Sequence, residues 1–112
     1  MRRGDIVFAD LSPVVGSEID KKRPVLIVSN DANNHSASTV TVLPITSNVA
    51  RTYPFEVLLP EGCCGLTKAS KAQAQQIRTI AKERLRGKVV GHLDEAFLRQ
   101  VEDAIRLHLS IR

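Results

Sequence analysis

The sequence has few aromatic residues and no long hydrophobic run. Its 112 residues include no Trp, one Tyr and three Phe. A sheet that binds RNA by stacking needs several exposed aromatic side chains, so this composition disfavours that mode of binding. No apolar stretch approaches the roughly 18 residues of a membrane-spanning helix. Residues 1–5 lack the apolar stretch and cleavage site of a signal peptide, so we expect a cytoplasmic protein.

Metal-binding motifs and common nucleophile motifs are also missing. The histidines His35, His92 and His108 show no metal-type spacing with one another or with a cysteine. There is no Gly-rich phosphate loop and no Gly-x-Ser-x-Gly motif. The two cysteines, Cys63 and Cys64, are adjacent, which is unfavourable for a disulfide, so we expect reduced thiols. We expect no metal or other cofactor, and any chemistry must come from Arg, Thr, Ser, Glu and backbone groups.

What the sequence does contain is a block of positive charge. The formal net charge is +4, but residues 61–90 alone hold seven basic and two acidic residues, a net charge of +5. The basic residues of this block are Lys68, Lys71, Arg78, Lys82, Arg84, Arg86 and Lys88. Such a block suits a polyanion, because phosphate contacts release counterions. A solvated face that keeps the protein in solution fits the same charge, so charge alone leaves both readings open.

Short apolar segments separated by Gly and Pro predict a mostly β fold with a C-terminal helix. The predicted strands cover residues 6–11, 24–29, 39–45, 55–59, 76–80 and 89–90. Residues 24–29 are almost continuously apolar, as in a strand buried on both faces. Pro44 cannot donate to a ladder, so we expect its strand at an edge or with a bulge. Asp94 is a plausible N-cap, and the apolar residues after it recur at helical spacing. We expect one small barrel domain over residues 1–112.

Two polar segments next to predicted strands form the candidate site. Residues 16–18 (Gly-Ser-Glu) precede Arg23, which Pro24 holds extended at the entrance of a strand. Thr46 and the serine after it follow the alternating strand. An Arg beside hydroxyl groups suits RNA cleavage by the RNA's own 2′-OH, because the protein then orients the nucleophile and stabilises charge on the phosphate. Alternatively, Arg23 pairs with an acidic residue of its own loop and Thr46 caps a turn.

Five ordered segments have the residues and spacing of a known family. They are residues 3–13, residues 16–18 with 23–29, residues 44–47 (PITS), residues 53–59 (YPFEVLL) and residues 76–80 (QIRTI). Together they resemble the MazF/PemK family of toxins from residue 2 to about residue 109. The resemblance implies an SH3-like barrel of the CcdB/PemK type, usually a homodimer.

The same resemblance implies a function and a partner. Members are metal-independent endoribonuclease toxins that cut single-stranded RNA, often mRNA, at short sequences. Cleavage leaves a 2′,3′-cyclic phosphate and a 5′-hydroxyl. The implied partner is a cognate, MazE-like antitoxin whose acidic C-terminal part lies across the RNA groove.

The resemblance also implies catalytic roles for Arg23, Thr46 and Glu18. Arg23 matches the family's Arg before Pro, Thr46 its catalytic Thr, and Glu18 a loop acid with a supporting or base role. Because the pKa of an arginine exceeds about 12, we expect Arg23 to act mainly by electrostatic stabilisation. Ser17 and Gln75 stand where some members carry an acid–base His and Asp, so the general base is Glu18 or a water. The residues expected to contact RNA are Ser17, Lys22, Ser47, Gln76 and Arg78.

Two other functions fit the same fold. A CcdB-like toxin would poison DNA gyrase by protein contact and would have no enzymatic activity. A plain SH3-like module would bind nucleic acid or protein without cutting it. The presence of Arg23 together with Thr46 favours the ribonuclease.

Overall fold

The computed structural model of the chain describes residues 1–12 and 22–112, so Ser17 and Glu18 lie outside the described residues. A seven-stranded antiparallel sheet forms the body of these described parts. The strands are β1 (Asp5–Asp10), β2 (Lys22–Ile27), β3 (Thr39–Thr46), β4 (Glu56–Leu59), β5 (Ser70–Gln73), β6 (Arg78–Ala81) and β7 (Leu85–His92). The helices are α1 (Asp31–Ser36) and α2 (Glu95–Leu109), with short 3-10 turns η1 (Cys63–Gly65), η2 (Ala74–Gln76) and η3 (Lys82–Arg84). The predicted mostly β fold with a C-terminal helix is confirmed.

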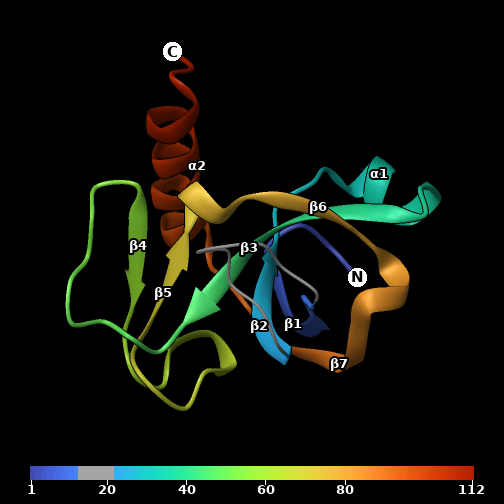
Figure 1. Cartoon of the computed structure of the whole chain (residues 1–112), viewed down its shortest axis with the longest axis horizontal. Coiled ribbons are helices and arrows are strands. Elements are labelled where there is room, and N and C mark those ends of the chain that lie inside the picture. Colours follow the sequence, from blue (N-terminus) through green and yellow to red (C-terminus); the bar gives the residue numbers. More distant parts are fainter. Residues whose placement is uncertain (13–21) are drawn as a thin grey trace.

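Strand β3 lies in the middle of the sheet. The strand order is β4-β5-β3-β2-β1-β7, and β6 also pairs with β3 (Figure 1). The expectation that Pro44 marks an edge or a bulge is therefore wrong. Residues 39–42 of β3 pair with β6 and residues 45–46 pair with β5. Pro44 falls between these two partners, so its missing N–H interrupts neither ladder.

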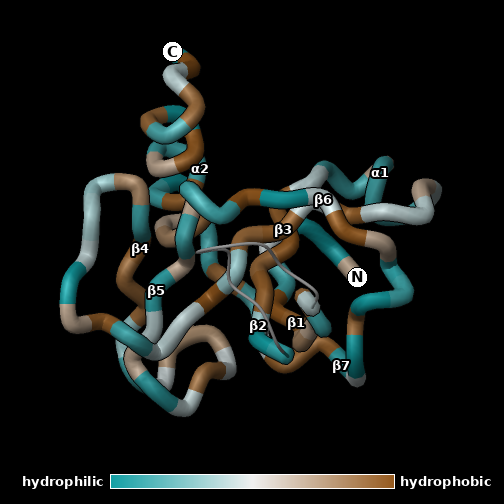
Figure 2. The backbone as a smooth tube through the Cα atoms, viewed as in Figure 1, coloured by the Kyte–Doolittle hydropathy of each residue, from teal (hydrophilic) through white to brown (hydrophobic). Residues whose placement is uncertain are grey.

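Both faces of the central strands are covered by apolar side chains. Alternate residues point to opposite faces, as the two-residue period of a strand requires. Ile6, Leu26 and Leu43 belong to one cluster, which also includes residues of α2. Val25 and Ile27 belong to a second cluster on the other face, with Val40 and Ile80 among its members. The strand predicted at residues 24–29 is β2, which ends at Ile27, and its residues 25–27 are buried on both faces as expected. Figure 2 shows the hydrophobic residues concentrated along these strands.

Helix α2 begins at the predicted cap and covers one face of the sheet. Asp94 Oδ1 accepts a hydrogen bond from the Phe97 N–H at 3.0 Å. Val101 and Ala104 are buried, whereas Leu109 at the far end is exposed because the helix extends beyond the strands (Figure 1). No helix in the described parts of the chain is long and apolar enough to cross a membrane.

A tight turn at η1 packs against the end of β7. A Cβ on Gly91 would overlap the carbonyl of Cys64, and a Cβ on Gly65 would overlap the Val90 carbonyl. Cys63 and Cys64 form a disulfide in this turn, so the expectation of reduced thiols is wrong for this structure. Cys64 adopts a left-handed conformation in this turn (φ 63°).

This backbone contact yields a stability prediction. Gly91→Ala should lower the free energy of unfolding by more than about 3 kcal/mol, because the new Cβ must displace backbone that cannot repack. Gly87→Ala is the matched control, since its Cβ would enter open space and only its positive φ of 77° costs stability, about 1–2 kcal/mol. Urea unfolding of the two variants checks this, and equal losses would show that the contact does not matter.

Candidate functional site

A surface pocket of about 560 Å³ opens where β2 and β3 part. The β2–β3 ladder runs from Ile27↔Val42 to Val25↔Pro44. Beyond Pro44, β3 continues along β5, while β2 continues along β1. The start of β2, the end of β3 and residues 65–68 line the space between them. The pocket therefore lies where the β2–β3 ladder ends.

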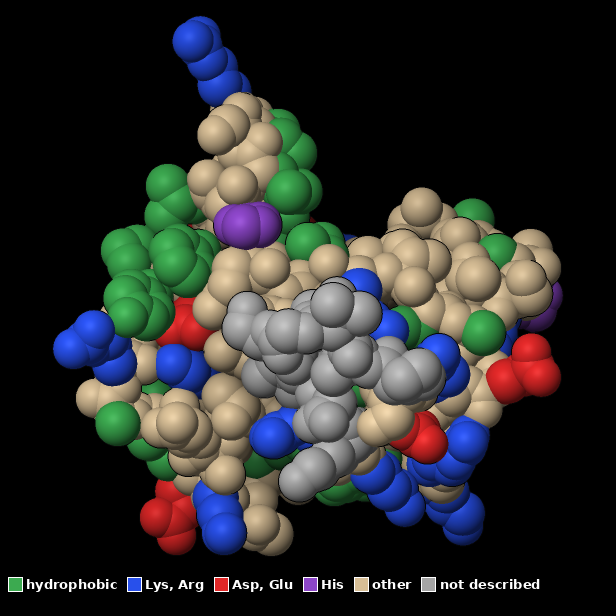
Figure 3. Space-filling model, in the orientation of Figure 1, with side chains coloured by type: hydrophobic (Ala, Val, Ile, Leu, Met, Phe, Trp, Pro, Cys, Tyr) green, Lys and Arg blue, Asp and Glu red, His purple; other side chains and the backbone are tan. Residues whose placement is uncertain are grey.

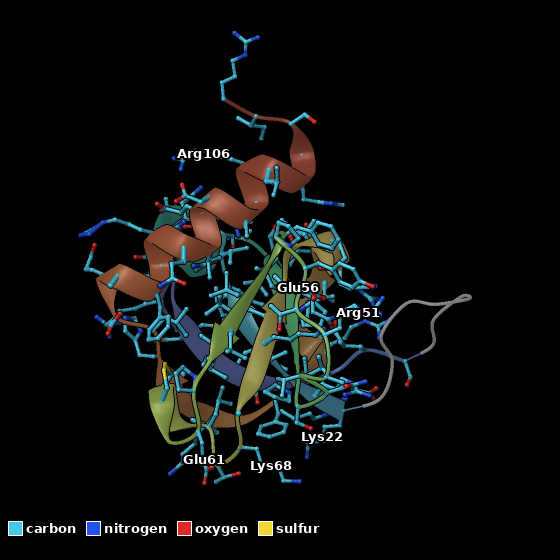
Figure 4. The ribbon with its side chains drawn as sticks, turned by 90° about the vertical axis from the view of Figure 1, so that its left-hand side faces the viewer. Lys22, Arg51, Glu56, Glu61, Lys68 and Arg106 are labelled. Carbon is cyan, nitrogen blue, oxygen red and sulfur yellow. A yellow bond between two sulfur atoms is a disulfide. The ribbon has the colours of Figure 1, made fainter. Side chains whose placement is uncertain are left out.

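Three of the predicted site residues line this one pocket. Lys22 and Arg23 come from β2, and Ser47 comes from the turn after β3. Lys68, which the sequence placed only in the basic block, lines the pocket as well. Lys22 and Lys68 are exposed and lie at the same end of the sheet (Figure 4). Among the described residues neither lysine forms an ion pair, so neither charge is neutralised by a neighbouring carboxylate there.

Thr46 is buried beside the pocket rather than in its lining. Its hydroxyl accepts a hydrogen bond from the Asn48 N–H at 3.2 Å, which is the turn-capping role given above as the alternative. Thr46 lies two residues beyond Pro44, where the β2–β3 ladder ends, and pairs with Lys71 of β5. Thr46 is the acceptor in the hydrogen bond with Asn48, so the hydrogen of its own hydroxyl can still be donated to another group.

Gln76 and Arg78 do not line the pocket. Gln76 is half-buried in η2, and Arg78 begins β6. The Arg78 guanidinium donates to the Leu11 carbonyl at 3.4 Å, and Arg84 donates to the carbonyls of Asp10 and Ser12. These two arginines therefore hold the end of β1, next to Lys22 in the ladder.

The basic block of residues 61–90 is not one free surface. Five of its seven basic side chains donate to backbone carbonyls of other segments or of neighbouring residues. These five are Lys71, Arg78, Lys82, Arg84 and Arg86. Figure 3 shows Lys and Arg side chains spread along the lower part of one face. Most of the basic side chains expected to bind a polyanion therefore also hold backbone segments in place through these hydrogen bonds.

A buried carboxylate, Glu56, organises the turn that follows β3. Its side chain is 1% exposed and forms an ion pair with Lys71 Nζ at 2.9 Å. Its oxygens also accept from the Tyr53 N–H at 3.0 Å, Gln73 Nε2 at 3.0 Å and Gln75 Nε2 at 2.6 Å. Lys71 Nζ in turn donates to the Arg51 carbonyl at 2.5 Å. Residues 51 and 53 are therefore tied to the sheet through one ion pair.

The hydrogen bonds keep Glu56 ionised despite its burial. Burial alone would raise its pKa, but the Tyr53 N–H, the Gln75 and Gln73 amides and Lys71 together lower the pKa to about 2. The same carboxylate fixes both amide groups. Because each must donate to it, the buried Oε1 atoms of Gln73 and Gln75 point away and accept no hydrogen bond from the described residues.

Nothing in the described geometry resembles a metal centre. Within residues 1–12 and 22–112, no three His, Cys, Asp or Glu side chains lie together as metal ligands would. The chemical resources of the pocket are cationic and hydroxylic side chains. They suit a phosphate-containing ligand, because guanidinium and ammonium groups donate to phosphate oxygens.

Comparison with known proteins agrees with this class of site. The profile of the family described as "PemK-like, MazF-like toxin of type II toxin-antitoxin system" matches residues 2–109. Endoribonuclease MazF9 of Mycobacterium tuberculosis is 47% identical over 116 residues, covering 99% of this chain and 98% of the relative. Endoribonuclease EndoA of Bacillus subtilis is 39% identical over 112 residues, covering 99% and 96%. The chain belongs to the PemK/MazF family of type II toxins.

Solved structures have the same fold. MazF from Deinococcus radiodurans superposes with a TM-score of 0.84 at 26% identity, covering 98% of this chain and 96% of that one. An endoribonuclease from a mycobacterial species, solved in complex with its cognate antitoxin, gives a TM-score of 0.82 at 26% identity, covering 100% and 97%. The expected PemK/CcdB-type fold is therefore confirmed.

The lowered pKa of Glu56 predicts how stability depends on pH. Because its pKa falls from 4.5 to about 2 on folding, Glu56 contributes stability that is fully present above pH 4.5 and is lost as the pH falls towards 2. Glu56→Gln should cost about 3 kcal/mol at pH 7, and its difference from the parent should shrink below pH 4.5.

Urea unfolding between pH 7 and pH 3 measures this difference. Glu61→Gln, at an exposed carboxylate in the neighbouring turn, is the control and should match the parent. A difference for Glu56→Gln that is the same at pH 7 and pH 3 would contradict the assignment.

Proposed function

We propose that this toxin is a sequence-specific, metal-independent endoribonuclease that cleaves single-stranded RNA by attack of the 2′-OH. The observation that carries the proposal is the convergence of Lys22, Arg23, Ser47 and Lys68 on one pocket, with Thr46 directly behind it. The curated relatives cited above are named endoribonucleases, which supports the same activity for this chain.

In the proposed reaction the nucleophile belongs to the substrate. The 2′-oxygen attacks the adjacent phosphorus and its proton passes to a base. The P–O5′ bond then breaks, and the leaving 5′-oxygen takes up a proton from the protonated base or from water. The products are a 2′,3′-cyclic phosphate and a 5′-hydroxyl. Arg23 stabilises the extra negative charge of the pentacovalent phosphate, since its guanidinium stays charged throughout. Thr46 donates its O–H to a phosphate oxygen and so orients the group for in-line attack.

The remaining roles rest on residues around the pocket. The base is Glu18, which lies outside the described residues, or a water. Ser17, Lys22 and Ser47 contact the RNA near the scissile phosphate, and Gln76 and Arg78 contact it farther away. A cognate MazE-like antitoxin with an acidic segment would compete for these cations, consistent with the antitoxin complex of the mycobacterial neighbour.

The proposed function leads to a prediction for Arg23 and Thr46. Purified protein incubated with a long RNA and EDTA should give discrete cuts at one short motif, with cyclic phosphate and 5′-hydroxyl ends. Arg23→Ala should abolish cleavage and Thr46→Ala should reduce its rate by roughly 100-fold. Mapping of the RNA 5′ ends, with circular dichroism as a check of folding, measures both effects.

Two results would contradict the proposal. Equal rates for Arg23→Ala and the parent would remove Arg23 from the site. No cutting by the parent, together with inhibition of gyrase supercoiling, would favour a CcdB-like poison instead.

A separate prediction concerns Lys22 and Lys68, the two lysines at the pocket. Each phosphate contact to a single strand contributes about −0.7 to the slope of log K against log salt concentration. Lys22→Ala and Lys68→Ala should each make this slope shallower by about that amount. Lys88→Ala is the control, because this exposed lysine on β7 does not line the pocket. Anisotropy titrations with an uncleavable RNA test this, and equal slopes for all three variants would contradict it.

A further inference from the structure

Two of the four aromatic side chains of the chain, Tyr53 and Phe55, stack on each other in the segment that follows Ser47 of the pocket. The rings of Tyr53 and Phe55 stack with their centroids 5.5 Å apart and an interplanar angle of 9°. Phe55 also contacts the His108 ring of α2, at 6.1 Å and 55°. Tyr53 is 43% exposed, whereas Phe55 is half-buried beneath it. The low aromatic count disfavours a broad stacking sheet, but these contacts form a narrow platform with one exposed ring.

The platform carries positive charge. The Arg51 guanidinium lies over the Tyr53 ring, 5.9 Å from its centroid and towards its hydroxyl, to which Arg51 Nη1 donates at 3.1 Å. The nearby carboxylate of Glu56 is buried and paired with Lys71, so it does not repel a phosphate at the surface. An aromatic face beside an exposed cation is the combination that binds single-stranded nucleic acid.

The backbone beneath the platform is fixed before any ligand arrives. The Tyr53 N–H donates to Glu56, and Lys71 donates to the Arg51 carbonyl, so both residues are held through the same buried ion pair. A ring already held in place loses little freedom on binding, and this favours affinity. The Glu56 network is thus a support for the platform.

The platform and the proposed catalytic pocket are joined along the chain by one short segment. Residues 47–55 begin at Ser47 in the pocket and end at the stacked rings. Figure 4 shows Arg51 and Glu56 on the same side of the molecule as Lys22 and Lys68, farther along towards α2. A strand of RNA held by the lysines can therefore extend along this segment.

We propose that Tyr53, backed by Phe55 and flanked by Arg51, is a stacking subsite for one unpaired RNA base outside the scissile step. This rests on the proposed ribonuclease function. Stacking on an aromatic ring tolerates any base, so the subsite adds affinity for single-stranded RNA without requiring a particular base there.

The test uses uncleavable RNAs that carry the mapped motif, with a 2′-deoxy nucleotide at the attacking position. Each flanking base is removed in turn by an abasic nucleotide, and binding is measured by anisotropy. For the parent, one abasic position should weaken binding by about 5- to 150-fold. Tyr53→Ala should bind the intact RNA as weakly as the parent binds the RNA with that abasic position. In Tyr53→Ala the same abasic position should have no further effect on binding.

Two variants serve as controls. Tyr53→Phe keeps the ring and should retain the parent's response to the abasic position. Leu58→Ala removes an exposed apolar side chain from neighbouring β4 and should bind like the parent. In cleavage assays Tyr53→Ala should raise KM and leave kcat near that of the parent, because the ring does not touch the reacting atoms.

The outcomes separate the subsite from the activity. If the parent cleaves RNA but Tyr53→Ala binds and cleaves equally well, the subsite is wrong and the ribonuclease function stands. If the parent neither binds nor cuts RNA, the proposed function itself fails. If Tyr53→Ala changes only the molecular mass measured by sedimentation, a second copy of the chain occupies the platform. If it changes only antitoxin binding, the antitoxin occupies the platform. Either result overturns the RNA subsite.

Discussion

The pairing of β3 is the constraint on which the site depends. One side of this strand pairs with β2, while the other side pairs first with β6 and then with β5. Where the partner changes, around Pro44, β2 and β3 separate and leave a pocket between them. The start of β2 and the turn after β3 therefore bring Arg23 and Ser47 to one place as a consequence of backbone hydrogen bonding.

The second organising interaction is the buried pair of Glu56 and Lys71. A buried ion pair adds little net stability when compared with apolar packing, but loss of one partner is costly. Here the pair also satisfies backbone groups of the segment after β3. Its contribution is thus to hold one geometry of that segment, including the exposed ring of Tyr53.

Much of the fold was predictable from local patterns. The apolar run at residues 24–29 and the capped helix after Asp94 depend on periodicity and capping, which are local properties. Strand β5 was not predictable, because all four of its residues are buried although Lys71 and Gln73 are polar. Their partners lie on β4 and the preceding segment, so no window along the chain reveals them. The pocket itself was missed for the same reason, since Lys68 reaches it only through the folded turn.

The two arginines at the end of β1 have a consequence for the neighbouring pocket. Arg78 and Arg84 pin the carbonyls of residues 10–12, and Lys22 pairs with Asp10 in the ladder. The connection between Ser12 and Lys22 therefore starts and finishes at fixed points of the scaffold. Two arginines of the basic block thus set where β1 ends, beside the strand residue Lys22 that lines the pocket, so charge far along the chain fixes one border of the site.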